Sequence, residues 1–92
     1  MKHDLQFEFD ENKSKSNKKK HGIDFVETQD LWDDEFGVIL DARSDDEKRY
    51  ALVSKLDNKI WVMIFTLRGE TVRIISVRRA RKEEVRLYGQ KN

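Results

Sequence analysis

One short segment of the chain places many positive charges at the end of an apolar run. Residues 73–82 read Arg-Ile-Ile-Ser-Val-Arg-Arg-Ala-Arg-Lys. The β-branched residues Ile74, Ile75 and Val77 favour a strand, and cations crowd its far end. Arginine stays charged at ordinary pH and grips phosphate oxygens through a planar fork. The pattern therefore predicts a phosphate-binding site, although a solvated basic surface paired with nearby carboxylates explains it too.

Cleavage of RNA is one reaction that such cations would serve. Without a metal ion, it needs a group that takes the 2′-hydroxyl proton, cations that stabilise the phosphorane, and a group that protonates the departing 5′-oxygen. Arginines at strand or turn ends are aimed by a fixed backbone and suit the second role. His21 carries an imidazole, the usual proton carrier near neutral pH, although it also suits the end of a helix as a simple cap.

Two groups of candidate site residues follow from this chemistry. The candidate catalytic residues are Lys20, His21, Arg68, Arg78 and Arg79. The candidate RNA-binding residues are Lys13, Asn17, Arg73, Arg81 and Lys82. Some of these side chains also suit a purely structural role. Asn17 is one of them, because an asparagine in a helix usually braces the helix. For the pair Glu47 and Arg49 we favour a surface ion pair, and for Tyr88 a packing role.

Composition limits the other classes of function. The 92 residues are 37% hydrophobic and 40% charged, as expected of one small domain over residues 1–92 with a modest core. The net charge of +1 hides an acidic segment, residues 24–47, and basic segments at 13–20 and 68–86. The absence of cysteine excludes disulfides and thiolate metal sites. His3 and His21 lack a metal-ligand spacing, and no glycine-rich phosphate loop is present, so we expect neither a metal nor a cofactor. Without a signal peptide or a membrane-length apolar run, a cytoplasmic location and no membrane contact are expected.

The N-terminal third predicts one strand and two helices. Leu5, Phe7 and Phe9 alternate with polar residues, as in a half-buried strand. Asp10 and Gly22 suit the two ends of a helix over residues 11–21. That segment has no apolar side chain, so a disordered basic loop is equally compatible. Its spacing would place Lys13, Asn17, Lys20 and His21 on one helical face.

A second helix should follow over residues 25–32. Asp24 and Glu27 resemble a capping box at its start. The side chains expected to face inward are Phe25, Thr28, Leu31 and Trp32.

The remainder predicts four strands joined by hairpins, followed by a helix. The strands should cover residues 38–43, 49–56, 60–67 and 71–78, and the helix residues 80–88, ending at Gly89. The third of these strands is apolar on both faces, so it should be central and covered on both sides. Consecutive hairpins imply an α+β fold, a small antiparallel sheet with two N-terminal helices and one C-terminal helix.

A regular hairpin also predicts where two of the arginines lie. It would place Arg68 and Arg78 on one face of the sheet but at opposite ends, with Val72, Ile74 and Ser76 in the row of Arg78. The two arginines should therefore not share one small pocket.

Residues spread over nearly the whole chain resemble one family. They are Phe7-Glu8-Phe9-Asp10, Lys13, Asn17, Lys20-His21-Gly22-Ile23, Phe25, Glu47, Arg49, Thr66, Arg68, Arg73-Ile74-Ile75-Ser76-Val77-Arg78-Arg79-Ala80, Glu84 and Tyr88. In order and spacing they resemble BrnT-type toxins. One departure is Phe9, where the family often has tryptophan.

This resemblance implies a ribonuclease toxin of a type II toxin–antitoxin system with a RelE-like fold. It also implies a BrnA-type antitoxin as partner, in a hetero-oligomer in which only the antitoxin contacts operator DNA. Two alternatives keep the basic surface without cleavage. One is a non-catalytic nucleic-acid-binding module, and the other is an inactive toxin retained as an operon co-repressor.

Overall fold

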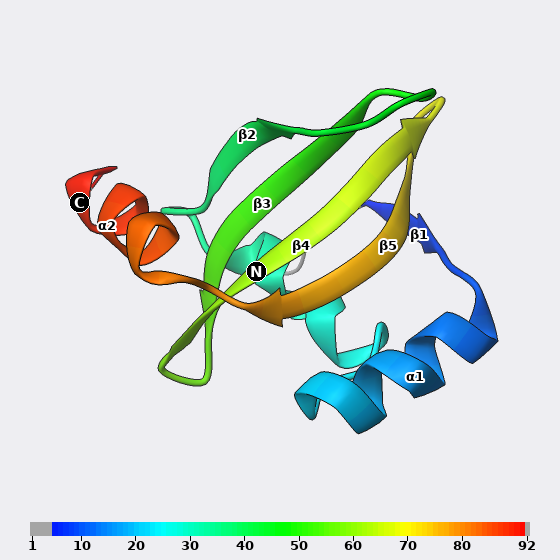
Figure 1. Cartoon of the computed structure of the whole chain (residues 1–92), viewed down its shortest axis with the longest axis horizontal. Helices are drawn as coiled ribbons and strands as arrows, with labels where there is room; N and C mark the ends of the chain where they lie inside the picture. Colours follow the sequence, from blue (N-terminus) through cyan, green and yellow to red (C-terminus); the bar gives the residue numbers. More distant parts are fainter. Residues whose placement is uncertain (1–4, 92) are drawn as a thin grey trace.

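The computed structural model describes residues 5–91, and His3 lies outside this range. Its elements are β1 (Gln6–Glu8), α1 (Glu11–His21), the 3₁₀ helix η1 (Glu27–Asp33), β2 (Val38–Ala42), β3 (Arg49–Leu56), β4 (Lys59–Arg68), β5 (Thr71–Arg79) and α2 (Lys82–Lys91) (Figure 1). The predicted α+β class and the predicted order of elements are both confirmed.

The five strands form one sheet in the order β1-β5-β4-β3-β2. The strands from β2 to β5 pair as antiparallel neighbours through successive hairpins. The predicted antiparallel sheet is confirmed for these four strands, and β1 adds a fifth strand at one edge as a parallel neighbour of β5. No hairpin joins these two strands, because α1, η1 and the other strands lie between them in the chain, so no local signal sets their direction.

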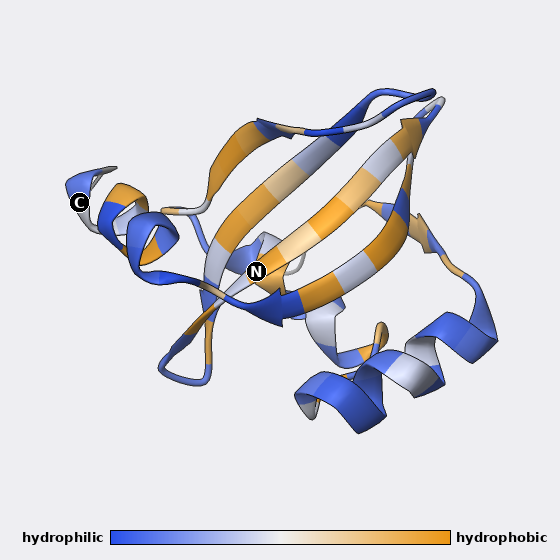
Figure 2. Ribbon diagram, in the orientation of Figure 1, coloured by the Kyte–Doolittle hydropathy of each residue, from blue (hydrophilic) through white to orange (hydrophobic). Residues whose placement is uncertain are grey.

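The central strand β4 is covered on both sides, as its two apolar faces predict. One face carries Trp61, Met63 and Phe65, which form the main core together with buried residues that follow α1. We call this the α1 face. The opposite face carries Val62 and packs in a smaller cluster around Tyr88 of α2, and we call it the α2 face. Figure 2 shows β4 as largely apolar and α1 as largely polar.

Helix α1 forms although it has no apolar side chain, so the helical alternative is confirmed. The Asp10 carboxylate caps its start by accepting hydrogen bonds from the backbone N–H groups of Asn12 at 2.8 Å and Lys13 at 3.1 Å. Gly22 ends it in the left-handed conformation at φ 81°, which glycine adopts without a steric penalty. Local capping therefore defines both ends of α1.

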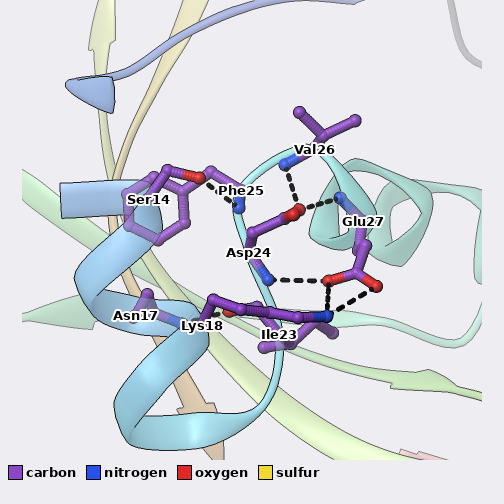
Figure 3. A network of polar contacts seen from close by, with 8 residues as sticks. All are labelled: Ser14, Asn17, Lys18, Ile23, Asp24, Phe25, Val26 and Glu27. Atoms are coloured by element: carbon purple, nitrogen blue, oxygen red, sulfur yellow. Dashed lines mark hydrogen bonds and ion pairs between the residues drawn. The ribbon is translucent and has the colours of Figure 1, made fainter. Parts of the chain in front are cut away.

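Polar contacts fasten α1 to the rest of the molecule (Figure 3). Ser14 and Asn17 are its buried residues. The Ser14 hydroxyl accepts a hydrogen bond from the N–H of Phe25 at 2.9 Å. The Asn17 amide donates to the carbonyl of Ile23 at 2.9 Å and accepts from the N–H of Val77 in β5 at 3.1 Å. Of the four residues predicted to share one helical face, Asn17 is buried, whereas Lys13, Lys20 and His21 are exposed.

The predicted capping box is present, but the helix that it precedes is a 3₁₀ helix. Asp24 Oδ1 accepts from the N–H groups of Val26 at 2.9 Å and Glu27 at 2.8 Å, and Glu27 Oε1 accepts from the Asp24 N–H at 2.9 Å. Phe25, Thr28 and Leu31 are buried as expected. Short connecting helices often take this tighter form.

A bulge in β5 changes which of its side chains share a face. Ile64 lies opposite Ser76, whereas Phe65 lies opposite Ile74, so Ile75 is an extra residue in β5. One extra residue moves all side chains on one side of it to the other face. The predicted row of Val72, Ile74, Ser76 and Arg78 is therefore wrong. Val72 and Ile74 are buried in the main core on the α1 face.

Helix α2 also differs slightly from prediction. It begins at Lys82 rather than near residue 80, and it continues through Gly89 to Lys91. Gly89 is not among the glycines with positive φ, so it extends the helix instead of ending it. None of the helices in residues 5–91 is long and apolar enough to cross a membrane.

Candidate functional site

Arginines and glutamates from distant parts of the chain gather at one end of the α2 face, where β4 turns into β5. We call this group the arginine cluster. Its members are Glu8, Glu47, Arg49, Thr66, Arg68 and Arg73. Arg73 lies opposite Thr66 across the β4–β5 pair and beside Glu8 across the β1–β5 pair. This end of the sheet is at the upper right of Figure 1, away from α2.

Two carboxylates hold the arginines of the cluster. Glu8 Oε2 accepts a hydrogen bond from Arg73 Nη1 at 3.1 Å and lies 3.9 Å from Arg68 Nε. Glu47 Oε1 lies 3.9 Å from Arg68 Nη2. The Arg68 side chain is still 55% exposed, against 30% for Arg73. Arg73 is therefore the firmly held cation, and Arg68 is the one that remains open to a ligand.

Thr66 and Arg49 form the floor of the cluster. Thr66 is 3% exposed, and its hydroxyl donates to the carbonyl of Lys48 at 2.7 Å. This bond fixes the backbone between Glu47 and Arg49. Among the residues described, the buried Nε of Arg49 has no hydrogen-bond partner. A buried donor without a partner is costly, but this nitrogen is shielded from solvent, so it does not itself face an arriving anion.

Arg78 lies at the opposite end of the α2 face, as predicted. It stands opposite Val62, six residues before Arg68 along β4, a separation of about 20 Å in a strand. Its guanidinium donates two hydrogen bonds to the Glu84 carboxylate, at 2.9 and 2.8 Å. This contact raises the pKa of Arg78 and lowers the pKa of Glu84 to about 2. Arg78 thus joins β5 to α2 through a bidentate ion pair.

The remaining candidate catalytic residues lie at that same end but on the other side of the sheet. Arg79 stacks over the Trp61 ring, with 5.5 Å between its guanidinium carbon and the ring centre. Lys20 and His21 are exposed at the end of α1, and Gly22, the next residue, lines a small cavity together with Trp61. The five candidate catalytic residues therefore do not converge on one point.

The candidate RNA-binding residues are also dispersed. Lys13 is exposed on α1, and Arg81 and Lys82 are exposed where α2 begins. Asn17 is 6% exposed, and both ends of its amide are hydrogen-bonded within the protein. It therefore braces α1 against β5, the alternative that its position in a helix favoured. Tyr88 is likewise buried.

Of the ten candidates, only Arg68 and Arg73 belong to the arginine cluster, where they lie with residues that had no assigned role in the site. Arg78 and Arg81 instead both donate hydrogen bonds to Glu84, Arg81 through its backbone N–H. The sequence did give a signal for Glu47, Arg49 and Thr66. Glu47 is two residues from Arg49, and Thr66 is two residues from Arg68, and residues two apart on a strand share a face. No spacing in the sequence placed Glu8 beside these residues, because its position depends on the parallel pairing of β1 with β5.

Exposed arginines at one end of a small α+β sheet are chemically suited to hold a phosphate group. A protein-family model described as the ribonuclease toxin BrnT of type II toxin–antitoxin systems matches residues 9–84. Because this match covers most of the chain, the chain belongs to the BrnT family of ribonuclease toxins. The predicted family resemblance is confirmed, and membership implies ribonuclease activity. No curated protein matches the chain.

Proposed function

We propose that this chain cleaves RNA without a metal ion and that the arginine cluster is where the RNA phosphate binds. The observation that carries the proposal is the juxtaposition of Arg68 and Arg73, from neighbouring strands, on an accessible end of the α2 face. Two guanidinium forks on a rigid sheet suit a phosphodiester, since each presents paired N–H donors.

The same arginines would supply the stabilisation that a metal ion gives in other nucleases. Charge builds up on the phosphorane oxygens as the 2′-oxygen attacks, and fixed cations favour that state over the ground state. Arg68 is the exposed cation for this role, with the less exposed Arg73 beside it. Seven of the candidate residues lie outside this cluster, and we propose only that they contact a longer RNA along its path. They are Lys13, Lys20, His21, Arg78, Arg79, Arg81 and Lys82.

The proposal includes a protein partner that keeps the toxin inactive. A BrnA-type antitoxin would bind in a hetero-oligomer and cover the arginine cluster, and operator DNA would be contacted through the antitoxin alone. Family membership supports the existence of a cognate antitoxin, and the exposed cations give an acidic partner a surface to recognise.

The test is RNA cleavage by the purified chain in the presence of EDTA. We expect fragments to accumulate at the same rate with the chelator, with added magnesium, and with neither. Loss of cleavage in EDTA that magnesium restores would contradict the metal-free mechanism. RNA binding without any cleavage would instead favour the non-catalytic binding module.

A further inference from the structure

The arginine cluster supplies cations for binding, but arginine does not accept protons at working pH. The proton acceptor of the reaction must then be one of the two carboxylates in the cluster or a residue elsewhere. We infer that Glu47 is the general base, the group that takes the proton from the 2′-hydroxyl of the RNA. This inference rests on the proposed metal-free ribonuclease function.

The contacts of the two carboxylates separate their roles. Glu8 is hydrogen-bonded to Arg73 at 3.1 Å and also lies near Arg68, so it serves to position the arginines. Glu47 approaches Arg68 only to 3.9 Å, which is longer than a hydrogen bond. Its side chain is 41% exposed. Glu47 is therefore the carboxylate free to accept a hydrogen bond from a bound ligand.

The backbone at Glu47 is held in place although the residue lies in a loop. The buried Thr66 hydroxyl binds the carbonyl of Lys48, the next residue, at 2.7 Å. Lys48 Nζ in turn lies 3.2 Å from Asp41 Oδ1 at the end of β2. These contacts place Glu47 beside Arg68, so that one phosphate gripped by Arg68 would bring its neighbouring ribose to the Glu47 carboxylate.

His21, the other candidate for the base, lies too far away. Asn17 of α1 contacts Val77, four residues from Arg73 along β5, or about 13 Å. His21 lies one turn beyond Asn17 on the helix, next to the cavity that Gly22 and Trp61 line at the far end of the sheet. A proton could not pass directly from a ribose at Arg68 to this imidazole, because general bases work at hydrogen-bond distance.

The step balances without any co-reactant except water. The Glu47 carboxylate takes the 2′-hydroxyl proton as the 2′-oxygen bonds to phosphorus. The bond from phosphorus to the 5′-oxygen breaks, and the 5′-oxygen receives a proton from water. The hydroxide left behind removes the proton from Glu47 and restores the carboxylate. The products are a 2′,3′-cyclic phosphate and a 5′-hydroxyl end.

The experiment compares Glu47→Gln with the wild type and with Glu35→Gln, which removes the same charge at an exposed position outside the cluster. Cleavage rates are measured from acid to neutral pH, together with RNA affinity, thermal melting and the chemistry of the product ends. We expect kcat of Glu47→Gln to fall about 10²- to 10⁴-fold, the usual size of a general-base effect. RNA affinity and melting should change little, and Glu47→Asp should recover part of the rate.

The pH profile distinguishes a base from a structural carboxylate. A general base must be deprotonated, so the wild-type rate should rise with pH along an acid limb, and Glu47→Gln should lack that limb. Cleavage by Glu47→Gln at the wild-type rate, an acid limb that disappears in His21→Gln instead, or ends bearing a 5′-phosphate would each overturn the inference while leaving the ribonuclease proposal standing. An inert wild type would overturn both.

Discussion

At the scale of single residues, two arginines on one face of the sheet have different environments. Arg68 is 55% exposed, and within residues 5–91 no carboxylate approaches it closer than 3.9 Å. Arg78 is 25% exposed, and its guanidinium is hydrogen-bonded to Glu84 and to the carbonyl of Arg79. The type of residue does not separate a ligand-binding cation from a structural one, whereas the partners already bound to it do.

Arg68→Ala should therefore lose activity and Arg78→Ala should lose stability. Removing a transition-state cation costs about 10²-fold or more in rate, and each lost phosphate contact should reduce the salt slope of RNA binding by about 0.7. Removing Arg78 leaves Glu84 without its charged partner, a cost of about 2 kcal/mol, or a melting shift on the order of 10 °C.

Thermal melting of both variants, with cleavage rates measured well below the melting range, tests this contrast. An Arg78→Ala protein that melts like the wild type but no longer cleaves RNA would place Arg78 in the active site after all.

At the scale of elements, polar side chains hold α2 near both of its ends, in addition to the apolar packing around Tyr88. Glu84 pairs with Arg78 and also accepts a hydrogen bond from the N–H of Arg81 at 2.8 Å, which caps the start of the helix. Near its end, the Tyr88 hydroxyl donates to Asp34 Oδ2 at 2.7 Å. Burial, followed by this hydrogen bond, raises the pKa of Tyr88 to about 12. Ionised and hydrogen-bonded groups thus fix α2 at both ends.

The stability given by Glu84 should depend on pH. Its pKa in the folded protein is lowered to about 2, chiefly by the hydrogen bonds from Arg78, and lies near 4.3 in an unfolded chain. A lowered carboxyl pKa stabilises the fold above the unfolded value, and this stabilisation is lost as the pH falls towards 2. Wild type should therefore exceed Glu84→Gln in free energy of unfolding at pH 7, and the difference should shrink between pH 5 and pH 2.

Urea denaturation of both proteins across this range measures the difference directly. A gap that stays constant down to pH 2 would mean that Glu84 acts through packing and not through its charge.

Local rules predicted the elements that local contacts determine. Asp10, Gly22 and the Asp24–Glu27 box mark helix ends through bonds within a few residues, and β4 reads as central because both of its faces are apolar. The parallel β1–β5 pair and the bulge at Ile75 arise from contacts between distant segments, which no window of sequence contains. Those two features bring Glu8, Arg68 and Arg73 together, so the site was less predictable than the fold.

At the scale of the whole molecule, charge is segregated even though the net charge is only +1. Acidic residues dominate from residue 24 to residue 47, and basic residues dominate α1 and the segment from residue 68 onward. The arginine cluster lies where the acidic loop before β3 meets Arg68 at the end of β4 and Arg73 near the start of β5. A partner that covers the cluster must therefore match both signs of charge, and this requirement favours one specific partner over any acidic protein.

The last prediction concerns how a cognate antitoxin would silence this chain. If the antitoxin covers the arginine cluster, the purified complex should not cleave RNA, and association should be fast and slow down with added salt, because opposite charge steers encounter. Arg68→Ala should weaken that salt dependence, whereas Lys59→Ala should not. Lys59 offers a matched control because it is an exposed cation at the other end of the same strand. Association kinetics at several ionic strengths, followed by a cleavage assay of each complex, measure both effects. A complex that cleaves RNA as fast as the free chain, or equal salt responses in the two variants, would place the antitoxin on another surface.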